Sequence, residues 1–332
     1  MKATLLVFYY FIFSVSLYAQ QTDSTYGERL GYPKGAKVVI VHVDDVGMSF
    51  DSNEGAINAM SKGIATSCSV MMPCPWVPAY VHYLKEHPQT DAGLHLTLTS
   101  EWDNYRWPPL SGKPTVPGLV DKEGALWPEV PDVVAHASAD EVEIEIRAQI
   151  ERARQMGFEP THMDSHMGTL FASPAYLQRY VKLAIEYHIP VMFPAGHASI
   201  ISVQSKLPLL QMQTMKVIGQ QLWNAGLPVL DDIFSETGWN LPNGTPETDE
   251  NLQKFKTQKY KEAFASMKPG ITYLIMHCTQ PSEIFKHISA SGPQRKADML
   301  AMMNPELKRY VESEHIILVT WKELSERRKK LL

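Results

Sequence analysis

The stretch from Lys37 to Gly47 constrains the fold more than any other part of the chain. Residues 38–43 form a short apolar run rich in β-branched side chains, typical of a strand buried on both faces of a parallel sheet. The run ends in two adjacent carboxylates, Asp44 and Asp45, at the end of a strand where parallel α/β folds place their functional face. Because the two like charges repel, we expect a divalent metal beside them; an ordinary turn and helix N-cap is the alternative.

Strand-like and helix-like segments alternate along the rest of the chain. Further strands are expected at residues 65–72, 91–98, 160–166, 188–193, 227–233, 271–277 and 315–320. Helices are expected at residues 49–62, 77–86, 139–156, 174–187, 207–223, 250–267, 295–311 and 322–330. This order predicts a single-domain α/β fold, a distorted (β/α) barrel with mostly parallel strands and right-handed crossovers.

The composition is that of an ordinary globular protein. The 332 residues are 44% hydrophobic and 20% charged, enough for one large α/β domain. The formal net charge is -5 and no dense basic run precedes the C-terminal tail, so no nucleic-acid partner is expected. The 3 cysteines fit no disulfide framework, and we expect Cys68 and Cys74 to be buried free thiols, with a bridge between them as the alternative.

The first 20 residues have the pattern of a signal peptide. Lys2 precedes an apolar core at residues 5–13, and small residues lead to a cleavage point near Gln20 or Gln21. The apolar run is shorter than the roughly 20 residues that a membrane span needs. We therefore expect residues 1–20 to be removed and residues 21–332 to be exported to the periplasm or the extracellular space, without stable membrane insertion. An uncleaved anchor is the alternative.

A long stretch without periodicity, residues 101–133, is rich in tryptophan, proline and glycine. Loops of this length inside a domain are usually functional or disordered. Trp102, Trp107 and Trp127 favour a lid that lines a substrate site, because sugar rings stack their C–H faces on indoles. A packed surface loop is the alternative.

Polar residues stand where four predicted strands end. They are the Asp44–Asp45 pair, His95, Asp164 with His166, and His277. In a barrel these strand ends converge on one face. One carboxylate with two imidazoles is a facial ligand set that leaves positions open for water and substrate. Zinc suits these ligand types well, whereas magnesium would be unusual with two imidazoles.

Five motifs, in their order along the chain, resemble those of the YdjC-like carbohydrate deacetylases, relatives of the chitooligosaccharide deacetylases. The motifs are Val43–Gly47, Asn53–Gly55, Gly63–Ser67, Gly93–Leu98 and Pro160–His166. The resemblance covers residues 37–320. It implies a distorted (β/α) barrel that removes N-acetyl groups from amino sugars or short chitooligosaccharides and releases acetate.

The resemblance also assigns roles to individual residues. It implies that Asp45, His95 and His166 hold one divalent metal ion, Zn²⁺ or Mg²⁺. Asp44 would be the general base that accepts a proton from water. His277 would lie near the reacting amide and protonate the departing amine, which suits its ordinary pKa of ~6.5.

Contacts to a small carbohydrate substrate are expected from Gln149 and Asp164, together with the three tryptophans of the long loop. Gln149 falls where the family has a glutamine that faces the site. Two positions depart from the family pattern: residues 167–169 replace further histidines after the Asp-Ser-His motif, and Cys278 replaces a proline after His277. These departures affect substrate contacts rather than the proposed ligands.

Two other functions remain open from the sequence. One is a different barrel metal hydrolase or isomerase, acting on a phosphate ester or a free sugar, although no clustered lysine and arginine site supports the ester. The other is an exported sugar-binding protein with a degenerate metal site. The sequence also leaves open whether the chain forms a homodimer.

Overall fold

A parallel sheet of seven strands lies at the centre of the protein, whose computed structural model describes residues 24–332. The predicted signal peptide, residues 1–20, lies outside the described residues. The strands are β1 (Lys37–Val46), β2 (Ser67–Val70), β3 (Ala92–Leu96), β4 (Met163–Ser165), β5 (Asp232–Phe234), β6 (Gly270–Met276) and β7 (Ile317–Leu318). They pair in parallel in the order β4-β3-β2-β1-β6-β5, and β7 also pairs with β1.

The sheet curls, and single bridges connect its two outer strands. Met163 of β4 forms a parallel bridge with Val191, and Pro194 forms another with Leu230, just before β5. The expected strand at residues 188–193 is therefore reduced to isolated bridges. Pro190 and Pro194 explain this, because proline has no N–H to donate to a ladder. The predicted distorted (β/α) barrel with parallel strands is confirmed.

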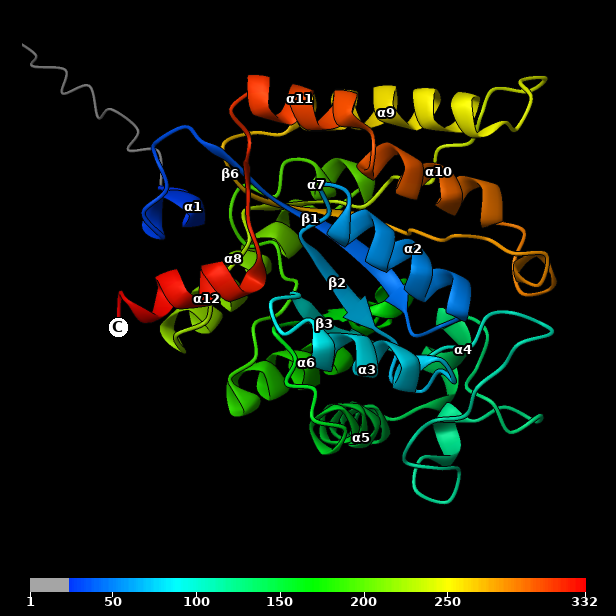
Figure 1. The fold of residues 1–332 in the computed structure, drawn as a ribbon. Coiled ribbons are helices and arrows are strands. Elements are labelled where there is room, and N and C mark those ends of the chain that lie inside the picture. Colours follow the sequence, from blue (N-terminus) through cyan, green and yellow to red (C-terminus); the bar gives the residue numbers. More distant parts are fainter. Residues whose placement is uncertain (1–23) are drawn as a thin grey trace, which may run out of the picture.

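Helices cover the outside of the curled sheet (Figure 1). They are α1 (Tyr26–Arg29), α2 (Phe50–Ser61), α3 (Val77–Glu86), α4 (Val130–His136), α5 (Ala139–Gln155), α6 (Pro174–Tyr187), α7 (Ile201–Gln204), α8 (Leu209–Asn224), α9 (Asp249–Ser266), α10 (Gly292–Met302), α11 (Pro305–Ser313) and α12 (Trp321–Lys329). Short 3-10 helices are η1 (Pro117–Leu119), η2 (His166–Phe171) and η3 (Phe285–His287). None of the helices in residues 24–332 has both the length and the apolar character needed to cross a membrane.

One expected helix is present as two separate helices. The segment at residues 295–311 is divided into α10 and α11, which meet at Asn304 and Pro305. Pro305 has no N–H and occupies the first turn of α11, and the Asn304 side chain accepts a hydrogen bond from the Glu306 N–H at 2.9 Å. The apolar periodicity continues through this break, which is why the sequence pattern alone suggested a single helix.

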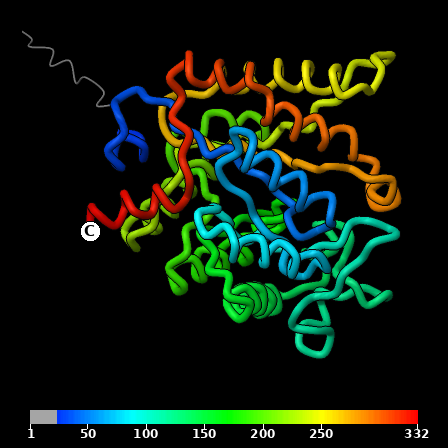
Figure 2. Tube along the Cα trace, in the orientation of Figure 1, coloured from blue at the N-terminus to red at the C-terminus, as the bar shows by residue number. Residues whose placement is uncertain are grey.

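The long loop lies at the carboxyl ends of the strands. Figure 2 shows residues 101–136 as an excursion on the side to which β1 runs. Arg106 ties the loop together, because its Nη2 donates to Asp121 Oδ2 and to the Leu126 carbonyl, both at 2.7 Å. The loop thus forms an ordered wall beside the strand ends.

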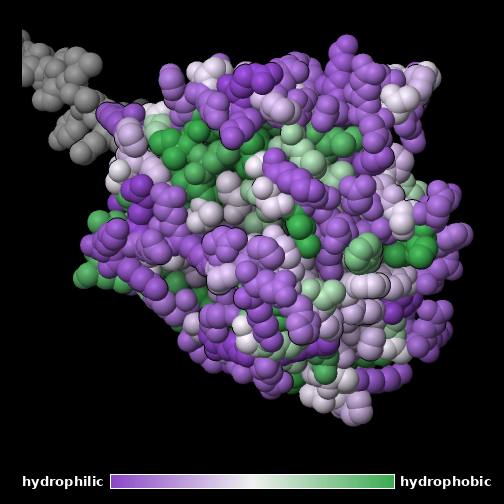
Figure 3. Space-filling view, viewed as in Figure 1, coloured by the Kyte–Doolittle hydropathy of each residue, from purple (hydrophilic) through white to green (hydrophobic). Residues whose placement is uncertain are grey.

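The core is centred on β1, whose apolar residues from Val38 to Val43 are fully buried. Cys68 and Cys74 are also buried, and neither forms a disulfide, as the sequence predicted. The face of the protein seen in Figure 3 is mainly hydrophilic, with its largest apolar area below helices α9 and α11.

Candidate metal centre

A bulge at the end of β1 turns two neighbouring carboxylates to the same side. Between Val43 and Val46, β1 contains one residue more than the part of β2 that pairs with it. Regular alternation would send Asp44 and Asp45 to opposite faces of the sheet. Asp45 instead has a φ of 63°, in the left-handed region, and bulges of this kind redirect a side chain. Both carboxylates consequently approach His95.

Asp45, His95 and His166 come together where β1, β3 and β4 end. Asp45 Oδ1 lies 3.2 Å from His95 Nε2 and 3.4 Å from His166 Nδ1, and the two nitrogens are 3.2 Å apart. A tetrahedral ion with bonds of about 2.0 Å separates its ligand atoms by about 3.3 Å. Among residues 24–332, the buried Asp45 Oδ1 has no hydrogen-bond partner. This donor set therefore fits a small divalent cation.

Carboxylates hold the far side of both imidazoles. His95 Nδ1 donates to Asp164 Oδ1 at 2.6 Å, and His166 Nε2 lies 3.1 Å from Glu101 Oε2. Such partners fix the tautomer of a metal-ligating histidine and direct its other nitrogen to the ion. Asp164 is only 1% exposed, so the structure places it behind His95 rather than against a substrate.

Arg295 completes the surroundings of Asp45. Its Nη1 lies 2.6 Å from Asp45 Oδ2, which leaves Oδ1 directed at the two histidines. Burial raises the pKa of Asp45, but Arg295, His166 and His95 outweigh this effect and hold that pKa well below its usual value. Asp45 is therefore a carboxylate across the whole neutral pH range.

The same charges keep protons on the histidines while no cation is bound. Burial lowers the pKa of His95, but Asp44 and Asp164 outweigh this effect and raise it well above its usual value. Burial also lowers the pKa of His166, while Glu101 and Asp45 together raise it to about 9. A cation that takes this position must displace protons from these rings.

Asp44 lies beside the three ligand atoms. Its Oδ2 lies 3.8 Å from His95 Nε2 and 4.0 Å from His277 Nε2. His277 follows the end of β6, and burial and the nearby Arg295 lower the pKa of its imidazole. Asp44 and His277 thus face each other at the edge of the candidate metal site, where a general base and a proton carrier are needed for amide hydrolysis.

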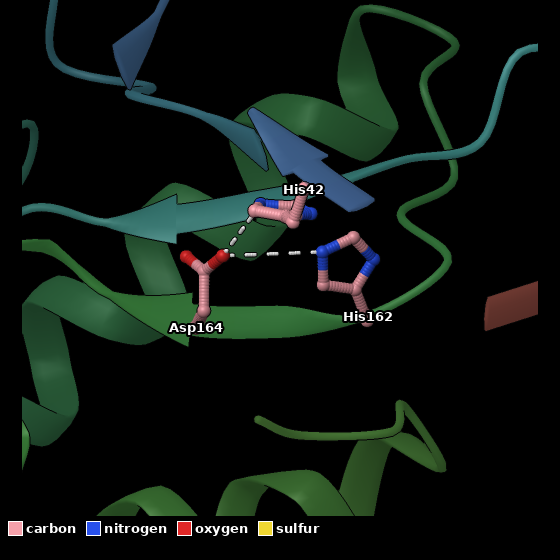
Figure 4. Close-up of side chains that lie close together, drawn as sticks. All are labelled: His42, His162 and Asp164. Carbon is pink, nitrogen blue, oxygen red and sulfur yellow. Dashed lines mark ion pairs between the residues drawn. The ribbon is translucent and has the colours of Figure 1, made fainter. Parts of the chain in front are cut away.

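A cluster of buried polar side chains lies behind the ligands and extends to Asp44. It consists of His42, His162, Asp164 and Tyr273. Figure 4 shows His42 and His162 directed at Asp164, at 3.0 and 3.9 Å from its Oδ2. The Tyr273 hydroxyl donates to the same oxygen at 2.8 Å. His42 Nε2 also lies 3.2 Å from Asp44 Oδ1, so one imidazole contacts both carboxylates.

The sequence interpretation missed three contributors to this centre. His42 carried a usable signal, because its spacing of two residues from Asp44 puts both on one face of a strand. Glu101 follows β3 closely, where an acidic residue could have been noted. Arg295 gave no local signal, since it belongs to α10 and contacts Asp45 across 250 positions of sequence.

The chain matches the sequence profile of a family described as YdjC-like protein over residues 38–313. It belongs to that family. A carbohydrate deacetylase from Thermus thermophilus is 29% identical over 299 residues, which cover 90% of this chain and 97% of the relative. A carbohydrate deacetylase from Brevibacillus brevis is 29% identical over 289 residues, 86% of this chain and 99% of the relative. A chitooligosaccharide deacetylase from Yersinia enterocolitica is 31% identical over 135 residues, 39% of this chain and 49% of the relative.

A solved structure shares the fold of this YdjC-like protein. It is an Enterococcus faecalis protein described as a cellobiose-phosphate cleavage protein, with a TM-score of 0.69 and 20% sequence identity. The superposition covers 87% of this chain and 99% of that one. At this identity the likeness supports the fold alone.

In this YdjC-like protein, Gln149 does not face open space. It is fully buried in α5 and packs behind the end of β3. Its Oε1 accepts from the Thr97 N–H at 3.0 Å, and its Nε2 donates to the Thr97 carbonyl at 2.7 Å and to Glu145 Oε1 at 3.0 Å. A buried amide must find such partners, so Gln149 holds the backbone beside the site rather than contacting a sugar.

The three tryptophans of the long loop differ in position. Trp107 is 1% exposed and belongs to the core. Trp127 stacks on His136 of α4, with ring centroids 4.1 Å apart. Trp102 alone of the three approaches the centre, because its ring lies 6.0 Å from the Arg295 guanidinium carbon. Of the expected lid residues, Trp102 is therefore the one placed beside Arg295, which contacts the ligand candidate Asp45.

Proposed function

We propose that this protein is a metal-dependent carbohydrate deacetylase, which hydrolyses the N-acetyl group of an amino sugar or a short chitooligosaccharide and releases acetate. One observation carries the proposal: Asp44 stands between the Asp45–His95–His166 ligand set and His277. The printed names of the Thermus, Brevibacillus and Yersinia relatives support the same reaction.

Zinc is the ion that best suits the ligands Asp45, His95 and His166. Two imidazole nitrogens and one carboxylate oxygen are typical of catalytic zinc, whereas magnesium prefers oxygen ligands. The separations of 3.2–3.4 Å between the ligand atoms also suit a tetrahedral ion better than an octahedral one. Neighbouring ligand atoms of an octahedral ion with bonds of about 2.1 Å would be about 3.0 Å apart. When bound, the ion would polarise the acetyl carbonyl and lower the pKa of a water molecule.

The protein's own residues move the protons of the hydrolysis. Asp44 Oδ2 accepts a proton from the attacking water while the water oxygen adds to the carbonyl carbon. His42 Nε2 lies 3.2 Å from Asp44 Oδ1, on the side of this base away from His277. His277 Nε2, 4.0 Å from Asp44 Oδ2, takes up this proton and passes it to the sugar nitrogen as the C–N bond breaks. The products are acetate and a free amino sugar.

The direct test uses residues 21–332 loaded with zinc. N-acetylglucosamine and its short β-linked oligomers are supplied, and acetate and free amine are measured separately. We expect the two products in a ratio of one to one. Asp45→Ala should lose both the zinc, measured by elemental analysis, and the activity. Release of neither product from any of these sugars by zinc-loaded protein would contradict the deacetylase, and failure to bind zinc would favour a sugar-binding protein.

We propose that the protein is exported, on the strength of residues 1–20 of the sequence alone. In bacterial cells that express the full chain, mass spectrometry of the periplasmic fraction should find a mature N-terminus near Gln20 or Gln21. A full-length chain found only in the cytosol would contradict export.

A further inference from the structure

A large apolar cavity opens beside the two catalytic candidates. Its volume is about 480 Å³, and Asp44, His277 and Ser165 form the part nearest the metal ligands. The other walls come from η2, α6, α7, α8, β5, β6 and residues 192–194, 205, 207 and 235, and their polar side chains are Ser205, Gln211, Thr214 and Ser235. Their apolar lining includes Phe171, Leu177, Phe193, Leu207, Met215 and Ile218.

The cavity reaches Asp44 and His277 at the edge of the candidate metal centre. Met167, which also lines it, directly follows the metal-ligand candidate His166. The Met167 sulfur lies 3.4 Å from the Thr99 hydroxyl, which belongs to the chain leaving β3. A substrate whose amide lies at Asp44 and His277 can therefore extend into this space without leaving the site.

An N-acetyl group and a sugar ring do not account for a lining of this kind. The acetyl group offers one methyl, and a pyranose needs hydrogen-bonding partners around its edge. The volume equals that of about 16 water molecules at about 30 Å³ each, and most of the side chains around it are apolar. Replacing this water by methylene groups of a bound substrate raises the affinity for that substrate about fourfold for each methylene buried.

We propose that the substrate carries a linear apolar substituent that occupies this cavity. This inference rests on the proposed function, because it places the hydrolysed amide at Asp44 and His277. The substituent has two sources, a long N-acyl chain or an apolar aglycone on an amino sugar. In the first case, water cleaves the amide into a longer carboxylate and the free amine, with the same balance of protons as for acetate.

The experiment compares three substrates on the zinc-loaded protein. They are the methyl β-glycoside of N-acetylglucosamine, its octyl β-glycoside, and the methyl β-glycoside of N-octanoylglucosamine, all below their micelle concentrations. Entry of three methylenes predicts a kcat/KM for amine release about 60-fold above the methyl acetyl compound. A gain for the second substrate identifies the aglycone as the apolar part, and a gain for the third identifies the acyl chain. Equal kcat/KM for all three would overturn the proposal.

Two neighbouring residues of α8 supply a matched pair of variants. Ile218→Gln makes the cavity wall polar at similar volume and should bring the octyl-to-methyl ratio close to one. Val217→Gln makes the same kind of change at a side chain that is 70% exposed, and should keep the wild-type ratio. Leu207→Gln is a second wall variant if Ile218→Gln does not fold. An unchanged ratio in a folded wall variant would refute the role of the cavity.

A binding measurement separates failure of this inference from failure of the deacetylase. Octyl β-glucoside has no amide, so its binding requires only the cavity and the sugar site. Calorimetry should detect binding to zinc-loaded wild type, weaker binding to Ile218→Gln, and wild-type binding to Val217→Gln. This result supports the cavity even if no substrate releases amine, whereas absence of binding to wild type counts against it.

Discussion

Replacing Asp164 by asparagine tests whether a buried carboxylate prepares His95 to bind a metal. Asp164 Oδ1 accepts from His95 Nδ1 at 2.6 Å, and Oδ2 accepts from the Tyr273 hydroxyl at 2.8 Å and lies 3.0 Å from His42 Nε2. An asparagine offers one acceptor oxygen and one NH₂ group. Whichever way it turns, the NH₂ faces a donor. If it faces His95, the ring moves its proton to Nε2 and loses the lone pair that a metal needs.

The size of the effect follows from the loss of this contact. Removal of a carboxylate behind a ligating histidine costs about 10–100-fold in metal affinity, or about 1.4–2.7 kcal/mol. The unpaired buried donor costs a further 1–3 kcal/mol or so of folding stability. Burial raises the pKa of Asp164, but His95 and His42 outweigh this effect and hold it well below its usual value. The carboxylate therefore stabilises the fold above the unfolded pKa of about 3.9, and this contribution is lost only as pH falls through the folded value. At pH 7 the variant loses all of it.

The assay is a zinc dissociation constant from competition with a chelator, together with urea unfolding of the metal-free protein. Asp231→Asn is the matched control, because this buried aspartate accepts backbone N–H groups of Tyr26, Gly27 and Ile271 near the amino end of β6. The control should lose stability but keep the wild-type zinc affinity. If Asp164→Asn also kept it, the proposed action of Asp164 through His95 would be refuted.

Three further predictions concern the proton on each group. Asp44→Asn should keep stoichiometric zinc by elemental analysis but lose about 10²–10⁴-fold in kcat; full activity would exclude Asp44 as the base. Because the pKa of His95 is held well above its usual value and that of His166 is about 9 in the metal-free protein, zinc binding at pH 7 should release protons from these rings. Calorimetry in buffers of different ionisation enthalpy counts the released protons, and a count of zero would contradict protonated rings. Burial raises the pKa of Cys68 to about 12, so the 3 cysteines should titrate with a thiol reagent only after unfolding; rapid reaction of native protein would contradict their burial.

Local sequence patterns were sufficient for most of the scaffold. Helices α3 and α6 begin and end at the predicted residues 77–86 and 174–187, since apolar periodicity and helix-end signals are properties of neighbouring residues. Strand ends carrying Asp45, His95 and His166 were expected to converge, because parallel strands in one sheet bring their carboxyl ends to the same edge. The structure places these three residues within reach of a single cation.

The sequence by itself thus determined the type of sheet, most helices and the three ligand candidates. Only the tertiary structure decided which groups surround them. Arg295 reaches Asp45 across 250 residues, and Asp164 lies behind His95 rather than against a substrate. Gln149 was expected in the site but holds the backbone of Thr97, just after β3. Such pairings, and the apolar cavity beside Asp44, depend on how helices distant in sequence pack together. The periodicity of a single segment cannot predict this packing.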